Sequence, residues 1–427
     1  MLRFVASLPA PLRRVWWLLL IGIMAVGGWL AFEYIPGVHF RVMVAWAKAY
    51  DTFVPHEDVL PTAEANSAVP TFSFVPPTAV ATSTPEAVAT AASLNITPTA
   101  TLSPTPIPDK VLLTGVRHEQ QYFNNCGPTT LAMALSFWGW EGDQHTIRPY
   151  LRPNKDDKNV SPEEMAVYLT PNGFDSVVRV NGDIETLKRF VAAGYPVILE
   201  KGLVCHAGAD RCEGWVGHYS LVVGYTGKRI LLEDSFLGSG LEMTNQDLLI
   251  DWRAFNYTYI VVFPAGAERR AQVLSLLGEA VDVERNYEAA LARAEVEAAN
   301  SQFSKEAFAW FNAGSSLVAL GDYADAAVAY DQARHAGIPS DLLWYQTGPY
   351  QAYAGVGRYE DVEHLASFAI STAHLSGVEE AYYWRGKARE ALGQPEQALK
   401  DYRSALEYNL NYQPAEVALV LLMQKQK

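Results

Sequence analysis

A cysteine, a histidine and an aspartate in the middle of the chain have the side-chain types that a nucleophilic enzyme needs. Cys126 stands in NCGPTTLAMALSFW, where Pro128 and the small and apolar residues after it predict a helix that begins at or just after the cysteine. The free N–H groups at a helix N-terminus carry partial positive charge and lower the pKa of a thiol placed there. Gly127 would leave room for a substrate to approach the sulfur. We therefore expect Cys126 to be a nucleophile.

Such a cysteine needs a base, and histidine is the usual choice. His218 stands in GWVGHYSLVVGY, at the start of a predicted strand. Thr226 and Gly227 then predict a hairpin turn, and sixteen residues after the histidine comes Asp234, at the end of the next predicted strand. Because adjacent antiparallel strands lie side by side, we expect Asp234 to reach the imidazole and to fix its tautomer and orientation.

The same chemistry needs a hydrogen-bond donor for the oxyanion that forms during acyl transfer. Gln121 and Gln120 lie five and six residues before Cys126. Either amide could reach the site beside the backbone N–H of the cysteine, and the sequence does not separate the two. This chemistry requires no cofactor and no metal ion.

A few helices followed by a mostly antiparallel sheet must hold these side chains. The first helix begins at Cys126, and a second is predicted over Ile184–Ala193. Five segments rich in Val, Ile, Leu and Tyr predict strands: Phe174–Val180, Tyr195–Glu200, Tyr219–Tyr225, Arg229–Glu233 and Tyr257–Pro264. We therefore expect an α+β domain over residues 109–265.

Taken together, these motifs resemble cysteine peptidase family 39, the papain-like bacteriocin-processing peptidases and their relatives. The resemblance lies in Gln-x(4–5)-Cys-Gly-Pro at a helix start, Gly-His-Tyr on a strand and Asp at a strand end, and it covers about residues 109–265. It implies a papain-like fold with Cys126 as nucleophile, His218 as general base and acid, and Asp234 as the orienting carboxylate. It also implies a glutamine as oxyanion donor, either Gln121 or Gln120.

Two departures from the family bear on the substrate. The bacteriocin-processing members usually carry Asp just before the cysteine, where this chain has Asn125. They are also fused to a transporter with a phosphate-binding GxxxxGK[ST] loop, which this sequence lacks. Cleavage at double-glycine leaders is therefore not expected.

The two other cysteines, Cys205 and Cys212, bracket HAGADR just before His218. Outside the cytoplasm, nearby cysteines tend to pair, and a disulfide between these two would leave Cys126 as the free thiol. A metal site is the alternative, but the spacing matches none of the usual zinc patterns; its ligands would be Cys205, His206, Cys212 and His218. The other histidines of the domain are expected to be structural or exposed: His118, His145 and His206.

Near its N-terminus the chain has eighteen residues without a charge, VWWLLLIGIMAVGGWLAF. About 20 residues span the hydrocarbon core of a bilayer as a helix, so we predict a transmembrane helix at residues 15–34. Arginines precede it, which places residues 1–14 in the cytoplasm and the rest of the chain outside. A cleaved signal peptide is the alternative, although the apolar run is longer than usual and has no small-residue cleavage site. The expected localisation is the cell membrane, single-pass, with the bulk extracytoplasmic.

Two segments of different composition follow. Residues 35–59 are apolar and aromatic with a few charges, and they predict a juxtamembrane helix, either interfacial or packed. Residues 60–108 are rich in Thr, Ala, Pro and Ser, which cannot bury a core and predict an extended linker. We expect this linker to hold the next domain away from the bilayer.

Beyond residue 265 the chain becomes Ala-rich and predicts tetratricopeptide-like helical repeats over residues 266–427. Gly321, Gly357 and Gly393 recur at intervals of 36, and small residues follow each glycine at fixed distances. An earlier, half-matched helix pair is expected between Glu268 and Ala299. Such solenoids usually present a concave face to a peptide or protein.

The whole pattern predicts a membrane-anchored cysteine peptidase that hydrolyses a peptide bond and binds a protein partner or substrate through its repeats. The formal charge of −14, from 33 basic and 47 acidic residues, argues against nucleic acid as a partner. Two alternatives stay open: a catalytically inactive scaffold that binds proteins, and an amide or acyl transferase that uses the same three residues.

Overall fold

The computed structural model describes residues 22–32, 35, 38, 41–42, 45, 59–62, 107–205, 214–299, 307–373 and 377–426. Among these residues, no helix is both long and apolar enough to cross a membrane. Residues 22–32 form a helix, but the rest of the predicted span, residues 15–34, lies outside the described residues. Membrane anchoring therefore stays a prediction.

The middle of the chain is organised around a seven-stranded sheet. Its path runs β2-β7-β3-β4-β5-β6, with β1 beside β4, and every neighbouring pair is antiparallel. The strands are β1 (Lys110–Leu112), β2 (Phe174–Arg179), β3 (Val197–Cys205), β4 (Gly214–Thr226), β5 (Arg229–Asp234), β6 (Gly238–Thr244) and β7 (Tyr259–Pro264). All five predicted strands are present. The β4 strand begins earlier than predicted, so His218 lies inside the strand and not at its start.

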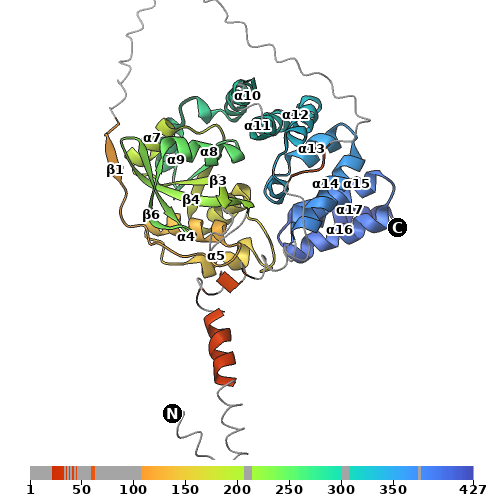
Figure 1. The fold of residues 1–427 in the computed structure, drawn as a ribbon, viewed down its shortest axis with the longest axis horizontal. Helices are drawn as coiled ribbons and strands as arrows, with labels where there is room; N and C mark the ends of the chain where they lie inside the picture. Colours follow the sequence, from red (N-terminus) through yellow and green to blue (C-terminus); the bar gives the residue numbers. More distant parts are fainter. Residues whose placement is uncertain are drawn as a thin grey trace, which may run out of the picture.

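Helices cover both faces of this sheet because its central strands are apolar on both sides (Figure 1). Along β3, Val197 and Leu199 pack on one face while Ile198 packs on the other, as the two-residue period of a strand requires. The helices of this unit are α4 (Cys126–Phe137), α5 (Gln144–Leu151), α6 (Pro162–Leu169), α7 (Ile184–Ala192), α8 (Asn245–Trp252) and α9 (Ala267–Leu277), with short 3-10 turns at Thr170–Asn172, Arg253–Phe255 and Gly278–Val281. The α+β expectation is confirmed.

The C-terminal helices form the predicted repeat array. They are α10 (Val283–Ala299), α11 (Ala307–Ala319), α12 (Tyr323–Ala336), α13 (Gly348–Gly355), α14 (Tyr359–Thr372), α15 (Glu379–Ala391), α16 (Pro395–Tyr408) and α17 (Gln413–Lys425), with a 3-10 turn at Ser340–Trp344. Gly321, Gly357 and Gly393 each end the first helix of a pair with positive φ, at +82°, +76° and +74°. This left-handed backbone favours glycine, which explains the 36-residue recurrence.

The predicted helix pair between residues 268 and 299 is divided between the two units. Val273 and Leu277 of α9 are buried in the core of the sheet, next to α7 residues. The α10 helix packs instead against α11. Only the second helix of the predicted pair therefore joins the repeats, because the apolar side chains of α9 complete the core beneath the sheet.

The repeats pack against the α+β unit at several places along the array. Near its start, Phe308 of α11 lies at a ring-centroid distance of 6.0 Å from Trp215 of β4. Further along, Tyr345 meets Phe255 edge-on at 5.9 Å. Near its end, Asn409 donates to Glu164 of α6 at 2.8 Å. Figure 1 shows the array curving beside the sheet. One hydrophobic cluster includes residues from both units, so the two share a core.

The start of the predicted linker is docked on the repeats. Leu60 is 1% exposed, and its backbone N–H donates to the carbonyl of Ile338 at 3.0 Å. Arg334 donates to the carbonyl of Pro61 at 2.8 Å. The extended linker predicted from residue 60 is therefore wrong for residues 60–62, because an apolar side chain there finds a buried site.

Candidate active site

Cys126 is the first residue of α4, as the sequence predicts. The thiol is half-buried and makes a hydrogen bond with the His218 side chain. It also accepts a hydrogen bond from the backbone N–H of Tyr219, the next residue of β4. The helix start and the strand thus meet at the sulfur. Cys126 is a free cysteine.

His218 and Asp234 lie beside each other on the adjacent strands β4 and β5. Nε2 of the imidazole is 3.0 Å from each carboxylate oxygen of Asp234, which leaves Nδ1 to face the thiol. Ser220 donates to Oδ2 of the aspartate at 2.6 Å. The backbone N–H groups of Phe236 and Leu237 donate to Oδ1 at 2.9 Å and 2.7 Å. The aspartate is fully buried, and these bonds hold it in one orientation.

The electrostatics of this group favour a thiolate–imidazolium pair. Burial raises the pKa of the Cys126 thiol, but the hydrogen bond and charge of His218 outweigh it, so the pKa lies below its ordinary value. Burial lowers the pKa of His218, but the charge and hydrogen bond of Asp234 outweigh it and raise that pKa to about 9. Burial raises the pKa of Asp234, but the His218 charge brings it well below its ordinary range. The two shifts together favour a proton on the imidazole over one on the thiol.

The two candidate oxyanion donors differ sharply in position. Gln121 is 5% exposed, and its Oε1 accepts a hydrogen bond from Ser235 at 2.7 Å. Its backbone N–H donates to the Ser235 carbonyl at 2.9 Å. Ser235 directly follows Asp234, so Gln121 is tied to the strand end that carries the aspartate, and its amide N–H₂ is left to donate. Gln120 has an exposed side chain, and its carbonyl accepts from Gln144 at 2.8 Å. The geometry favours Gln121.

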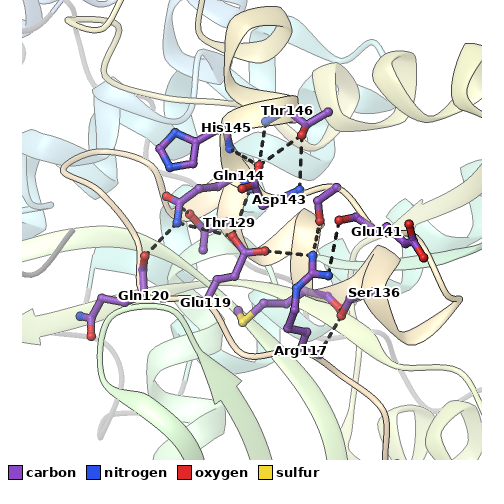
Figure 2. A network of polar contacts seen from close by, with 12 residues as sticks. Arg117, Glu119, Gln120, Thr129, Ser136, Glu141, Asp143, Gln144, His145 and Thr146 are labelled. Carbon is purple, nitrogen blue, oxygen red and sulfur yellow. Dashed lines mark hydrogen bonds and ion pairs between the residues drawn. The ribbon is translucent and has the colours of Figure 1, made fainter. Parts of the chain in front are cut away.

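Gln144 is a buried positioning residue that sequence analysis did not identify. Its Oε1 accepts from the Tyr122 backbone, the Asn125 side chain and the Thr129 hydroxyl at 3.1, 2.8 and 2.9 Å. Its Nε2 donates to the carbonyl of Gln120. Figure 2 shows Gln144 between the segment before the cysteine and helix α4. One amide thus fixes both the glutamine segment and the residues around Cys126.

Arg152 supports the same region from the other side. It is 2% exposed and donates to the side-chain oxygen of Asn125 at 3.3 Å and to the carbonyl of Phe123 at 3.4 Å. Its charge contributes to the lowered pKa of the Cys126 thiol. Asn125 is fully buried, and it uses both its acceptor and its donor. An aspartate would offer no donor to the Gln144 oxygen, which gives a physical reason for the departure from the family pattern.

Gly127 has a packing role that the sequence does not suggest. It is buried, and an added Cβ would lie 3.0 Å from Cε of Met165 and 3.1 Å from Cβ of Val160. The missing side chain therefore allows α4 to pack closely against its neighbours. The expectation that Gly127 makes room for a substrate at the sulfur stays a prediction.

The other candidates lie away from the thiol or outside the described residues. Nδ1 of His118 is 2.9 Å from Oε2 of Glu233, and His145 meets Tyr122 edge-on at 5.1 Å. Both are structural or exposed, as predicted. The predicted Cys205–Cys212 disulfide and the alternative metal site with His206 lie outside the described side chains, so both stay predictions.

The geometry agrees with the matches to family models. Residues 113–260 match the peptidase C39-like family, and residues 379–412 match the tetratricopeptide repeat. The chain carries a peptidase C39-like domain followed by a tetratricopeptide repeat. The C39-like match spans the residues from just after β1 into β7, and it includes Cys126, His218 and Asp234.

The solved structures that are similar to parts of the chain include the following three. A C39-like peptidase from Bacillus anthracis is 17% identical and covers 37% of this chain and 100% of its own, with a TM-score of 0.30. The first tetratricopeptide region of Spaghetti (RPAP3), bound to the HSP90 peptide SRMEEVD, is 27% identical over 29% of this chain and 94% of its own, with a TM-score of 0.25.

The third is a double glycine motif protease from an AMS/PCAT transporter in complex with its leader peptide. It is 13% identical over 36% of this chain and 99% of its own, with a TM-score of 0.27. The family assignment depends on the family models and not on these scores. No curated protein matches the chain.

Proposed function

We propose that the C39-like domain is an active cysteine peptidase in which Cys126 is the nucleophile, His218 the general acid and base, and Asp234 the orienting carboxylate. The observation that carries this proposal is the continuous hydrogen-bonded series from the Cys126 thiol through the His218 ring to the buried Asp234 carboxylate. A cysteine that served only as a small core side chain would need neither a histidine nor an ordered carboxylate behind it.

The reaction follows from these positions. The Cys126 thiolate attacks the carbonyl carbon of the scissile bond, and the oxyanion receives hydrogen bonds from the Gln121 amide and the Cys126 backbone N–H. The imidazolium of His218 gives its proton to the leaving amine as the C–N bond breaks, which leaves a thioester. The neutral imidazole then takes a proton from water as the hydroxide adds to the thioester carbonyl, and the C–S bond breaks. This releases the acid product and regenerates the thiolate–imidazolium pair.

The repeats supply a surface for a peptide or protein partner in this proposal. Tetratricopeptide repeats are a fold that binds peptides, and here the array lies against the catalytic domain. Tyr345 of the repeats receives a hydrogen bond from the backbone of Gly217, the residue before His218. A cavity of about 920 Å³ is lined by both units, including Tyr345 and Glu200. The lining of this cavity includes none of Cys126, His218 and Asp234, so it supports partner binding between the two units and not access to the thiol.

The function is tested by incubating the full chain with a peptide library and mapping cleaved bonds by mass spectrometry. We expect the wild-type chain to cleave peptides, and we expect Cys126→Ala and His218→Ala to abolish this cleavage. Glu233→Gln, which changes the carboxylate paired with His118, should retain it. Absence of cleavage in the wild type, or equal cleavage in Cys126→Ala, would favour the inactive scaffold. Water labelled with ¹⁸O should label the new C-terminus, whereas an amine adduct in its place would indicate amide transfer.

We also infer that the predicted helix at residues 15–34 anchors the chain, with the folded units on the extracytoplasmic side. The support is the uncharged apolar run and the arginines that precede it. Fractionation of cells that produce the full chain tests this inference, since an anchored protein stays with membranes after carbonate washing. Recovery of the intact chain in the soluble fraction would contradict it.

A further inference from the structure

Four carboxylates meet where the end of the repeat array contacts the C39-like domain. One oxygen each of Glu164, Glu379 and Glu380 lies within 4.8 Å of the others. Asp157, in the loop before α6, lies beside Glu379, since the two carboxyls are close enough to bond through a proton. Two of these residues belong to the catalytic domain and two to the first turn of α15. We call this group the carboxylate cluster.

Several oxygens of the carboxylate cluster are buried without a partner. Asp157 is 0% exposed and Glu379 is 1% exposed. Oδ2 of the first and Oε2 of the second accept no hydrogen bond, and neither does the buried Oε2 of Glu380. Ionised carboxylates only accept hydrogen bonds, so neighbouring ones can be joined only through a proton or a cation. Unpaired buried charges of one sign strongly destabilise a folded chain.

The remaining oxygens of the cluster are held in place by neutral donors. Nδ2 of Asn409 donates to Oε1 of Glu164 at 2.8 Å and to Oε1 of Glu379 at 2.9 Å. Ser161 donates to Oε2 of Glu164 through its backbone N–H at 2.8 Å and its hydroxyl at 2.9 Å. These bonds fix the carboxylates without neutralising them. The site is therefore pre-organised around its unpartnered oxygens.

The nearby arginine does not neutralise the cluster by direct bonds. Arg152 donates to the backbone carbonyls of Phe123, Lys155 and Asp157 and to the Asn125 side chain. Its guanidinium is thus directed to the loop backbone and to the active-site helix. Among the contacts of the described residues, Arg152 therefore acts on the carboxylates only through its charge and not through a hydrogen bond to their oxygens.

We propose that the carboxylate cluster binds one divalent cation, with Ca²⁺ as the fitting ion, and that this cation fastens the repeats to the C39-like domain. Hard cations of this kind prefer carboxylate oxygens, and Ca²⁺ accepts six to eight of them at flexible distances of about 2.3–2.6 Å. Oxygens on opposite sides of such an ion are about 5 Å apart, and the three glutamate oxygens all lie within 4.8 Å of one another. Mg²⁺ would demand a stricter octahedron and keep several waters.

The ion has a route to this site. Glu164 and Glu380 line the cavity of about 920 Å³ between the two units, together with Glu163 and Glu416. Asp157 and Glu379 lie behind them, out of contact with bulk solvent. A cation can therefore enter through the cavity and meet the oxygens of the three glutamates, with Asp157 beside Glu379. This proposal does not depend on peptidase activity.

Calorimetric titration of the chelator-treated full chain with calcium chloride tests the proposal. We expect one Ca²⁺ per chain and an increase in the thermal unfolding midpoint when calcium is added. Glu379→Gln and Glu380→Gln should each weaken binding by about tenfold or more, because affinity depends on the number of charged ligands. Glu163→Gln is the matched control, because Glu163 is adjacent to Glu164 but does not belong to the carboxylate cluster. This change should alter the calcium affinity by less than about twofold.

Variants that fail to fold would not decide the question, so stability in chelator is measured as well. Each Gln variant removes one like charge and should be at least as stable as the wild type when no calcium is present. Absence of saturable binding up to about 10 mM calcium, beyond the range of extracellular calcium modules, would overturn the proposal. Equal affinity in the wild type and in Glu380→Gln, whose side chain is half-buried, would overturn it too.

Discussion

Two neighbouring glutamines before Cys126 differ in burial and hydrogen bonding, and this difference makes the role of the oxyanion donor testable. Gln121 is buried and bonded to Ser235, whereas the neighbouring Gln120 points its side chain to solvent. Loss of one oxyanion donor costs about 10²- to 10³-fold in rate. We expect that loss for Gln121→Ala and a change below about threefold for Gln120→Ala.

The measurement for this pair is the cleavage rate of a peptide that the wild-type chain hydrolyses. Gln120→Ala is the control, because it removes the same side chain one residue away. A large effect at residue 120 with none at residue 121 would mean that the oxyanion donor has been assigned to the wrong glutamine.

Asp234 controls both the orientation and the protonation of His218. Its negative charge raises the pKa of the imidazole to about 9, so Asp234→Asn should lower that pKa, because burial alone disfavours the charged ring. Activity that needs the imidazolium would then be lost at lower pH, and the alkaline limb of the pH profile should move down from about 9. The rate should also fall by about 10²- to 10⁴-fold.

The pH dependence of peptide cleavage checks this prediction, with Glu233→Gln as the matched control. That residue is the adjacent carboxylate, bonded to His118 and not to His218. An unchanged alkaline limb in Asp234→Asn would contradict the role given to the aspartate.

The sequence reveals a functional residue when the residues next to it in the chain already indicate its chemistry. Cys126, His218 and Asp234 stand in short motifs whose residue types already indicate the chemistry. Gln144 has no such signal, since its role comes from accepting bonds from three groups that only the folded chain brings together. The preference for Gln121 over Gln120 likewise depends on Ser235, which is remote in sequence.

Among the secondary-structure elements, the turns between paired helices each depend on a glycine that recurs every 36 residues. Gly393 has φ of +74°, and an added Cβ would contact nothing within 4 Å. The cost of Gly393→Ala is therefore backbone strain alone, about 1 kcal/mol of unfolding free energy. Gly393→Asn should cost less, because asparagine tolerates the left-handed region better.

Denaturant unfolding of the three chains measures this difference. An alanine variant as stable as the wild type would mean that the turn adopts another conformation. The periodicity itself was readable from the sequence because identical turns require the same residue. The division of the helix pair between residues 268 and 299 could not be predicted from the sequence. Whether α9 packs on the sheet or on the repeats depends on which apolar surface it meets.

Across the whole molecule, the two units share one hydrophobic cluster, so they should unfold together. Trp215 lies between Phe255 and residues of the repeats, at 6.0 Å from Phe308 and 6.1 Å from Tyr345. Trp215→Ala removes this contact and should cost about 3 kcal/mol. We expect one unfolding transition for the wild type and two for the variant.

Calorimetric unfolding tests this coupling, with Val167→Ala as the control at an exposed position. Two transitions in the wild type would show that the shared cluster does not couple the units. The sequence predicted both units but not their contact, because Trp215 comes 93 positions before Phe308 and 130 before Tyr345. The same limit applies to the carboxylate cluster, whose members come from both units.

The central claim is that Cys126 is a thiolate activated by His218, and the pH dependence of its alkylation by iodoacetamide tests this most directly. The rate at Cys126, resolved from the other cysteines by mass spectrometry of peptides, should follow a pKa clearly below the ordinary thiol value of about 8.5. His218→Gln should move that pKa upward, because it removes the imidazolium and leaves the burial. A wild-type rate that rises only at or above pH 8.5, with the same curve in His218→Gln, would contradict the account.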